Sequence, residues 1–344
     1  MINTEWLHAA AKPIDQGMLA AARQRQGQLT KPPGSLGYLE EVAVRLAAMQ
    51  GTQQPSLERV RIAVFAADHG IADEGVSAFP QAVTGQMILN FVQGGAAISV
   101  LARQLGATLE VVDVGSLADS AAMAGVIVAK AGSGSANFRR QAAMSEGQLA
   151  AALAAGKDAV ERALAGRAQL FIGGDMGIAN TSSATAISCA LLGASATEVA
   201  GPGTGLDEGG VAHKARVIDE ALALHSAELT SPLAILRHVG GFEIAALCGA
   251  YVACAQAGLP VLVDGFIASA AALLAVRLLP GAADWQFYGH ASAEPGYVYL
   301  MEALSARPLV NLGMRLAEGR HLPVQRGGQA HDRQGHRRAA RANG

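Results

Sequence analysis

Short apolar runs that end in Asp, Gly or His alternate with longer segments rich in Ala and Leu along most of the 344-residue chain. The short runs have the length of buried strands, whereas the longer segments have the length of helices. This alternation predicts a largely parallel sheet with helices on both faces. We therefore expect an α/β fold with a Rossmann-like sheet. The expected strands lie within residues 61–70, 108–115, 169–175, 259–265 and 284–290.

Local signals mark the start of two expected helices. Ser145 followed by Gln148 predicts a capping box for a helix over 146–166. The Ser-Pro pair at 231–232 places an N-cap residue before a proline at the first helical position of a segment over 232–256. Ligands of open parallel sheets bind at the carboxyl ends of the strands, where loops and helix N-termini meet. We expect the functional site at that edge.

The two ends of the chain depart from the alternation. Residues 1–55 have helical character without a convincing strand, and the turn at 31–40 separates two candidate helices, so we expect a small helical lobe packed against the sheet. Residues 56–319 would form the main α/β domain. Residues 320–344 contain six arginines, three of the nine histidines and one acid. We expect this basic tail to be poorly ordered; a nucleic-acid-binding tail is the alternative.

The composition excludes several classes of function. With 51% hydrophobic residues, the chain can bury one large core or two modest ones, as a globular enzyme does. A formal net charge of -2 argues against nucleic acid or an anionic membrane as the main partner, so a small ligand is expected. The N-terminus has no secretory pattern, and the apolar stretch at 259–279 is interrupted by polar residues. Both features indicate a cytoplasmic protein without a membrane span.

Three cysteines, Cys189, Cys248 and Cys254, occur in the chain without metal-ligand spacing. Free cysteine behaves as a small apolar residue and is often fully buried. We therefore expect buried, inert thiols and no metal site.

The segment at 170–187 runs from an apolar strand into glycines, an acid and a cluster of hydroxyls. Gly177 supplies flexible backbone, and Asn180, Thr181 and Ser182 lie at the expected start of a helix. Unpaired N–H groups and the helix dipole favour an anion such as phosphate at this position. The segment matches neither the dinucleotide fingerprint nor the Walker pattern.

A second glycine-rich segment lies at 200–214. Gly203 and Gly205, with Thr204 between them, let the backbone approach a ligand closely. Lys214 offers a charge-assisted hydrogen bond to phosphate. A mobile surface loop is the alternative for either glycine-rich segment taken alone. Two such segments in one α/β protein favour a phosphate site.

Two further segments contain candidate catalytic groups. Asp68 and His69 follow an expected strand, where they suit acid–base or metal chemistry, although a structural Asp–His hydrogen bond fits equally well. Glu318 ends an apolar stretch at 307–319. A carboxylate in apolar surroundings is a better base once ionised, whereas an exposed helix-end Glu is the alternative.

Nine motifs follow one another along roughly residues 1–319: KPPGSLGYLE, ADHGIADEGVSAFPQAVTGQM, GGAAISVLARQ, GDMGIANTSSATAI, GPGTGLD, GGFEIAALCGA, DGFIASAAALLA, GHASAEPG and NLGMRLAEG. In this collinear order they resemble the nicotinate-nucleotide:dimethylbenzimidazole phosphoribosyltransferase family. Members of that family displace nicotinate from nicotinate mononucleotide with 5,6-dimethylbenzimidazole and give α-ribazole 5'-phosphate, in the assembly of cobalamin.

The resemblance implies roles for individual residues. Glu318 would occupy the position of the family's catalytic carboxylate and accept the benzimidazole proton. Asp175 stands where the family has a glutamate, a second acid near the ribose, and is shorter by one methylene. The implied phosphate and ribose site contains Gly177, Asn180, Thr181, Ser182, Gly203, Thr204, Gly205 and Lys214. The implied base pocket contains Ser77, Gln81, Gln86 and Leu316.

The resemblance also implies the state and partners of the protein. It predicts a cytoplasmic homodimer that binds nicotinate mononucleotide and 5,6-dimethylbenzimidazole and uses neither a cofactor nor a metal. Its α/β catalytic domain would be residues 56–319. Asp68 and His69 would support the site without a direct part in the chemistry.

One departure from the family pattern follows Gly319. There the resemblance predicts small residues and another apolar helix that closes the helical lobe, but the chain continues as RHLPVQRGGQAHDRQGHRRAARANG. Such a change in composition is what a shifted reading frame produces. The alternative function is therefore a nucleotide- or base-binding protein with weakened or lost catalysis. A nicotinamide-dependent dehydrogenase is disfavoured because the first strand lacks the dinucleotide glycine fingerprint.

Overall fold

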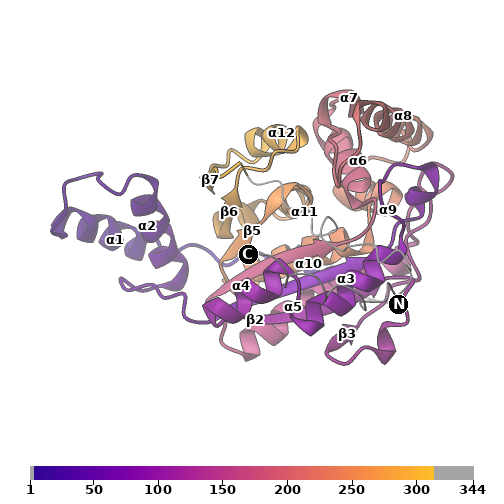
Figure 1. Ribbon diagram of the computed structural model, residues 1–344. Helices are drawn as coiled ribbons and strands as arrows, with labels where there is room; N and C mark the ends of the chain where they lie inside the picture. Colours follow the sequence, from indigo (N-terminus) through magenta and orange to yellow (C-terminus); the bar gives the residue numbers. More distant parts are fainter. Residues whose placement is uncertain (1–3, 314–344) are drawn as a thin grey trace, which may run out of the picture.

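The computed structural model describes residues 4–313, and within them a seven-stranded, wholly parallel sheet forms the centre of the molecule (Figure 1). The strand order β3-β2-β1-β4-β5-β6-β7 is that of a doubly wound sheet whose winding reverses between β1 and β4. The expected α/β fold is therefore confirmed. The strands are β1 (Val60–Ala67), β2 (Thr108–Gly115), β3 (Val126–Val128), β4 (Leu170–Met176), β5 (Val261–Val263), β6 (Gln286–His290) and β7 (Pro308–Val310).

Helices occupy most of the connections between the strands. The α-helices are α1 (Gln16–Gln28), α2 (Tyr38–Gln50), α3 (Ala82–Gln93), α4 (Ala97–Leu105), α5 (Glu146–Ala165), α6 (Asn180–Leu192), α7 (Ala196–Val199), α8 (Glu208–Leu224), α9 (Pro232–Val239), α10 (Phe242–Ala257), α11 (Gly265–Leu278) and α12 (Gly296–Ala303). Four short 3-10 helices are η1 (Glu5–His8), η2 (Gly70–Glu74), η3 (Ser120–Ala122) and η4 (Pro280–Trp285).

Five of the seven strands follow the alternation in the sequence. The sequence does not predict β3 and β7, because each has only three residues and lies at an edge of the sheet. An edge strand of this length does not produce the long apolar run of a central strand.

The side chains of β1 alternate between two cores. Ala63 and Phe65 pack into the larger core, to which α5 and α10 contribute, whereas Val64 and Ala66 pack into a smaller core that includes residues of α3. A strand that is covered on both faces must be apolar at every position. This double covering explains why β1 is a continuous apolar run from Ile62 to Ala67.

The segment expected as one helix over 232–256 forms two helices, α9 and α10. Ser231 caps α9 as predicted, since its Oγ accepts a hydrogen bond from the backbone N–H of Ala234 at 3.2 Å. The break lies at Gly240 and Gly241. A Cβ at Gly241 would clash with the ring of His69, so the glycine lets the chain pass against the end of β1 and aims the N-terminus of α10 at it.

The N-terminal helices α1 and α2 stand beside the sheet, at the side of β6 and β7 (Figure 1). The indole Nε1 of Trp285 donates a hydrogen bond to the carbonyl of Lys12 at 2.9 Å. Leu46 and Met49 of α2 pack with Trp285 and Phe287. We propose that this pair of helices is a small lobe distinct from the α/β domain.

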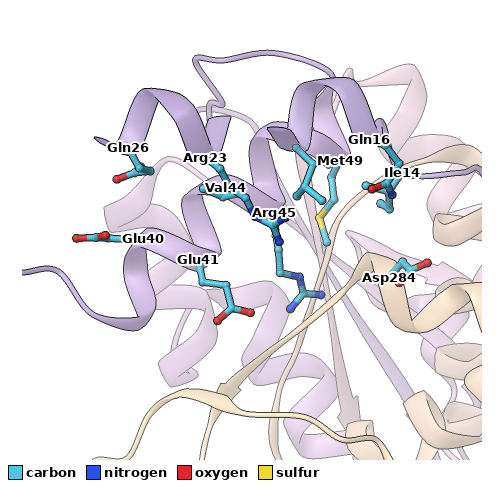
Figure 2. A pocket seen from close by; sticks show the side chains of 11 residues that line it. Ile14, Gln16, Arg23, Gln26, Glu40, Glu41, Val44, Arg45, Met49 and Asp284 are labelled. Carbon is cyan, nitrogen blue, oxygen red and sulfur yellow. The ribbon is translucent and has the colours of Figure 1, made fainter. Parts of the chain in front are cut away.

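A cavity of about 440 Å³ opens on α1 and α2 (Figure 2). The expected closing helix and the expected poorly ordered tail at 320–344 lie outside the described residues. The cavity is lined by Ile14, Gln16, Leu19, Arg23, Gln26, Glu40, Glu41, Val44, Arg45, Met49 and Asp284.

By length and composition, the stretch Ala82–Leu105 is apolar enough to cross a membrane. In the structure it forms two helices, α3 and α4, and α3 ends at Gly94 with a left-handed φ of 82°. Helices of 12 and 9 residues are each shorter than the roughly 20 residues that a span requires. Met87 and Ile88 of α3 are buried in the smaller core.

Helices α5 and α10 approach each other backbone to backbone. A Cβ at Gly156 of α5 would clash with the carbonyl oxygen of Ala246, and a Cβ at Gly249 of α10 would clash with that of Leu153. Glycine is required at both positions because any side chain would force the helices apart. The capping box predicted for α5 is confirmed: Ser145 and Gln148 each accept a hydrogen bond from the other's backbone N–H.

Replacing Gly156 with alanine should lower the free energy of unfolding by about 2 kcal/mol or more, because the overpacked helices must separate. Gly147 is the matched control, since no atom lies within 4 Å of the position of its Cβ. Gly147→Ala should change the stability by less than about 1 kcal/mol. Urea denaturation of both variants measures the difference, and equal losses would contradict the close contact.

Candidate active site

The crevice of this sheet lies where the winding reverses, at the carboxyl ends of β1 and β4. These two strands are hydrogen-bonded neighbours, with Phe65 in register with Asp175. Asp68 and His69 follow β1 directly, and Gly177 follows β4. Two of the segments predicted to carry chemistry therefore meet at the edge of the sheet where ligands bind.

The turn from β4 into α6 leaves a helix N-terminus open at this edge. Ala179 adopts a left-handed conformation with φ of 74°, and no side chain caps the helix that starts at Asn180. The side-chain amide of Asn180 instead donates a hydrogen bond to Asp175 Oδ1 at 2.9 Å. The backbone N–H groups of Asn180 and Ser182 already donate to the carbonyls of Gly177 and Ala179, at 3.1 and 2.9 Å. The dipole of the helix still favours an anion at this end.

The second glycine-rich segment lies against the same N-terminus. Lys214 of α8 is buried, and its Nζ donates hydrogen bonds to Thr181 Oγ1 at 3.1 Å and to the carbonyl of Gly201 at 3.0 Å. Gly203 and Gly205 both have positive φ, at 53° and 122°. Burial lowers the pKa of Lys214 to about 8, and the carboxylate of Glu294 partly offsets this effect.

One narrow pocket joins six of the twelve predicted binding residues. Its volume is about 20 Å³, which is room for about one water molecule. Ser77, predicted to bind the base, lies in the same pocket as residues predicted to bind phosphate and ribose. The pocket is lined by Val76, Ser77, Gly177, Ala179, Asn180, Thr181, Pro202, Thr204, Leu206 and Lys214. The larger cavity of Figure 2 contains none of the predicted site residues.

Directly behind this pocket lies a buried polar cluster centred on His69. Its Nε2 lies 2.7 Å from Oε1 of Glu243, and its Nδ1 lies 3.0 Å from Oγ of Ser183. Burial favours the neutral imidazole, but the carboxylates of Glu243, Asp68 and Asp175 outweigh it and raise the pKa of His69. All three members of the hydrogen-bonded cluster have no solvent exposure, so they support the site from behind.

The surroundings of Asp175, at the end of β4, shift the pKa of its carboxyl group strongly. Burial, followed by the carboxylates of Glu243 and Asp264, raises its pKa to about 7, while the hydrogen bond from Asn180 opposes the shift. The phenol of Tyr251 is also buried nearby, and burial followed by the charge of Asp175 raises its pKa. Asp175 therefore carries a proton in a large part of the molecules at neutral pH.

Several predicted residues lie apart from the pocket. The side-chain amide of Gln81 donates a hydrogen bond to the carbonyl of His69 at 2.7 Å, so it holds the turn after β1. Gln86 is exposed on α3, and Ser182 is fully buried. Asp68 is also buried, and its Oδ2 accepts a hydrogen bond from the backbone N–H of Leu117 at 2.8 Å. Glu318 and Leu316 lie outside the described residues.

Four acidic or basic groups at this edge were not singled out by the sequence analysis. Asp264 and His290, at the ends of β5 and β6, form a pair with Oδ1 and Nδ1 2.8 Å apart. Glu243 and Glu294 each approach the crevice from a glycine-containing turn. In the sequence, each of the four lies within a few positions of a strand end or of a pair of glycines, and this position is the signal that could have identified them. In residues 4–313, no group of three or more His, Cys, Asp or Glu side chains is arranged to hold a metal ion.

A family model described as a phosphoribosyltransferase matches residues 11–321. The chain belongs to this phosphoribosyltransferase family. A protein of Pseudomonas putida (strain W619) named nicotinate-nucleotide--dimethylbenzimidazole phosphoribosyltransferase is 58% identical over 318 residues, which are 92% of this chain and 91% of the relative. A protein of the same name from Azotobacter vinelandii is 59% identical over 316 residues, 92% of this chain and 90% of the relative.

Solved structures of phosphoribosyltransferase relatives have the same fold. The crystal structure of CobT from Thermus thermophilus matches with a TM-score of 0.84 and 46% identity, over 88% of this chain and 91% of that chain. The resemblance noted in the sequence is thus confirmed. The family match ends at residue 321, where the basic composition of the tail begins.

Asp175→Asn should remove a pH-dependent loss of folding stability from this phosphoribosyltransferase. The folded state holds the proton of Asp175 up to a pH of about 7, whereas the unfolded chain releases it near 3.8. The stability contributed by the protonated group is therefore lost as the pH rises between these values. Asp175→Asn keeps the acceptor for the amide of Asn180 and does not ionise.

Because the side chain is only partly buried, we expect Asp175→Asn to unfold with a free energy about 2 kcal/mol higher than the parent at about pH 8. The gain should disappear below about pH 3, where the parent is protonated in both states. Denaturant unfolding at the two pH values measures it. A gain that is the same at both would show that the ionisation of Asp175 has no part in it.

Proposed function

We propose that this chain transfers the phosphoribosyl group of nicotinate mononucleotide to 5,6-dimethylbenzimidazole, giving α-ribazole 5'-phosphate and nicotinate, in the assembly of the nucleotide loop of cobalamin. The observation that carries the proposal is the convergence of an uncapped helix N-terminus, a glycine-rich turn and the buried Lys214 at the reversal of the sheet. The names of the relatives supply the two substrates. Loss of catalysis, the alternative, is not favoured by the similarity to these enzymes.

The 5'-phosphate is proposed to bind between the two glycine-rich segments. Lys214 would give it a charge-assisted hydrogen bond, and backbone N–H groups of the open helix end and the glycine turn would donate to the remaining oxygens. The site residues proposed for phosphate and ribose are Gly177, Asn180, Thr181, Ser182, Gly203, Thr204, Gly205 and Lys214. Among them, Ser182 would act indirectly, because its side chain has no solvent exposure.

The reaction exchanges one bond to the sugar for another. The bond between C1' and the nicotinate nitrogen breaks, and its electron pair neutralises the pyridinium, so the leaving nitrogen needs no acid. A new bond forms from C1' to a nitrogen of dimethylbenzimidazole, whose other ring nitrogen loses its proton. Glu318 is proposed as the base that accepts this proton.

Asp175 is proposed to lie beside the ribose. Its pKa of about 7 gives it two forms near neutrality: the protonated carboxyl donates a hydrogen bond, and the carboxylate stabilises positive charge that develops on the sugar. For the base pocket we propose Ser77, Gln81, Gln86 and Leu316. Of these, Gln81 would have to release the carbonyl of His69 in order to contact a base directly.

We further propose a homodimer in the cytoplasm. Helices α3 and α4 expose apolar side chains that a second copy would cover, with Leu89, Leu101 and Leu105 at 40%, 51% and 78% exposure. All three cysteines are free and buried, as in proteins of reducing compartments.

Glu318→Gln should abolish most of the release of nicotinate from nicotinate mononucleotide in the presence of dimethylbenzimidazole, with a fall in kcat of about 100-fold or more. Substrate binding should change little, since the shape of the side chain is kept. Glu302→Gln is the control, because Glu302 is an exposed acid on α12. Full turnover by the Glu318 variant would remove this residue from the mechanism, and binding without nicotinate release by the parent would support the alternative of lost catalysis.

Lys214→Met should raise KM for nicotinate mononucleotide by about 10-fold or more, because a hydrogen bond between two charged groups is lost. The effect on kcat should be smaller. Lys157→Met is the matched control, since Lys157 forms an ion pair with Glu161 on the outside of α5. Steady-state kinetics with varied nucleotide measures both variants. An unchanged KM would place the phosphate elsewhere.

A further inference from the structure

Glu294 reaches into the glycine-rich turn from a distant part of the chain. It precedes α12, and its Oε1 accepts a hydrogen bond from the backbone N–H of Gly203 at 3.1 Å. The two residues are 91 positions apart in the sequence. The carboxylate therefore already occupies one of the backbone donors in the proposed phosphate site.

The second oxygen of this carboxylate, Oε2, is buried and has no hydrogen-bond partner among the described residues. It lies against the backbone of Gly201, where a Cβ would clash with it. Lys214 is the charged side chain that faces Glu294. The other elements packed there present neutral groups: Thr181 Oγ1 from α6, and apolar side chains of α7 and α11.

A buried carboxylate with one unpartnered oxygen is costly to maintain in its charged form. Burial accordingly raises the pKa of Glu294, whereas Lys214 and the N–H of Gly203 lower it in part. The carboxylate is thus held by the backbone N–H of Gly203 and attracted by the charge of Lys214, whose Nζ donates to Thr181 Oγ1 and the carbonyl of Gly201. A phosphate oxygen would take the same N–H and be attracted by the same lysine.

The narrow pocket shows that the site has little room in this state. A volume of about 20 Å³ is room for about one water molecule, so side chains at this edge move before a phosphate group enters. A carboxylate and a phosphate cannot share one N–H, and two anions beside one lysine repel each other. Glu294 lies beside this pocket, because it accepts the N–H of Gly203 between the lining residues Pro202 and Thr204.

We propose that Glu294 is an internal anion that occupies the phosphate site when substrate is absent and sets the affinity for the phosphorylated substrate. This inference rests on the proposed function of the site. On substrate entry, the N–H of Gly203 is transferred from the carboxylate to a phosphate oxygen. Glu294 either turns away or takes up a proton, and in the protonated form its O–H donates to the phosphate.

The test is calorimetric binding of nicotinate mononucleotide to the full-length parent and to Glu294→Gln, from about pH 5.5 to about pH 7, so that Lys214, whose pKa is about 8, stays charged in the parent. At the upper end of this range the variant should bind about 10-fold more tightly, since the competing charge is gone. The ratio of the two Kd values should fall toward one as the pH falls, because burial raises the pKa of Glu294 and the competing carboxylate is progressively lost. Both proteins are compared at the same pH, so that the nucleotide has the same ionisation state in each pair of titrations.

Two controls separate this inference from a general effect on folding. Glu302→Gln on α12 should bind as the parent does at every pH. Nicotinate riboside, which lacks the phosphate, should bind equally to the parent and to Glu294→Gln. If the glutamine variant does not fold, as judged by its thermal transition, Glu294→Ala is measured in the same way.

The outcomes distinguish this inference from the proposed function. Equal or weaker binding of nicotinate mononucleotide by the folded variant across the pH range overturns the inference and leaves the proposed function intact. A parent protein that neither binds the nucleotide nor releases nicotinate overturns the proposed function itself. A gain in affinity that appears equally for the riboside also overturns the inference, since the effect would not act through the phosphate.

Discussion

The buried contact between His69 and Glu243 is the interaction on which the geometry of the site depends. His69 follows β1, Glu243 lies in the first turn of α10, and Ser183 of α6 completes the cluster at the other ring nitrogen. One imidazole thus connects the end of a central strand to the N-termini of two helices. Breaking a buried charged pair by removing one partner is strongly destabilising, so these three elements are held in a single arrangement.

This cluster also explains some of the glycines. A Cβ at Gly177 would clash with the carbonyl of Ala67 and press on the ring of His69, and one at Gly241 would clash with the same ring. Both glycines are therefore required by the packing behind the site, whether or not a ligand approaches them. Gly203 differs, because its positive φ and its N–H toward a carboxylate belong to the ligand side of the crevice.

The sequence predicts the central strands and the edge at which the site forms, because strand periodicity and the polar residues after each strand are local signals. It does not predict that Gln81 donates a hydrogen bond to the carbonyl of His69 in the turn after β1, or that Glu243 lies under the crevice. Both contacts depend on which helix N-terminus points at which strand. The glycine at 241 has the same cause, since the need for it comes from the ring of His69, far away in the chain. Edge strands of three residues leave too short a pattern to detect.

The charges at the carboxyl edge of the sheet are arranged so that an anionic substrate meets little repulsion. Glu243 faces His69 and Asp264 faces His290, so two carboxylates have an imidazole partner. Among residues 4–313 no cation forms an ion pair with Asp175, but burial raises its pKa to about 7. Glu294 faces the buried Lys214 of the second glycine-rich segment, and burial raises the pKa of Asp68. Acidic side chains can therefore line a site for a nucleotide, because each has its own means of neutralisation, and the lysine with the backbone N–H groups is left to attract the phosphate.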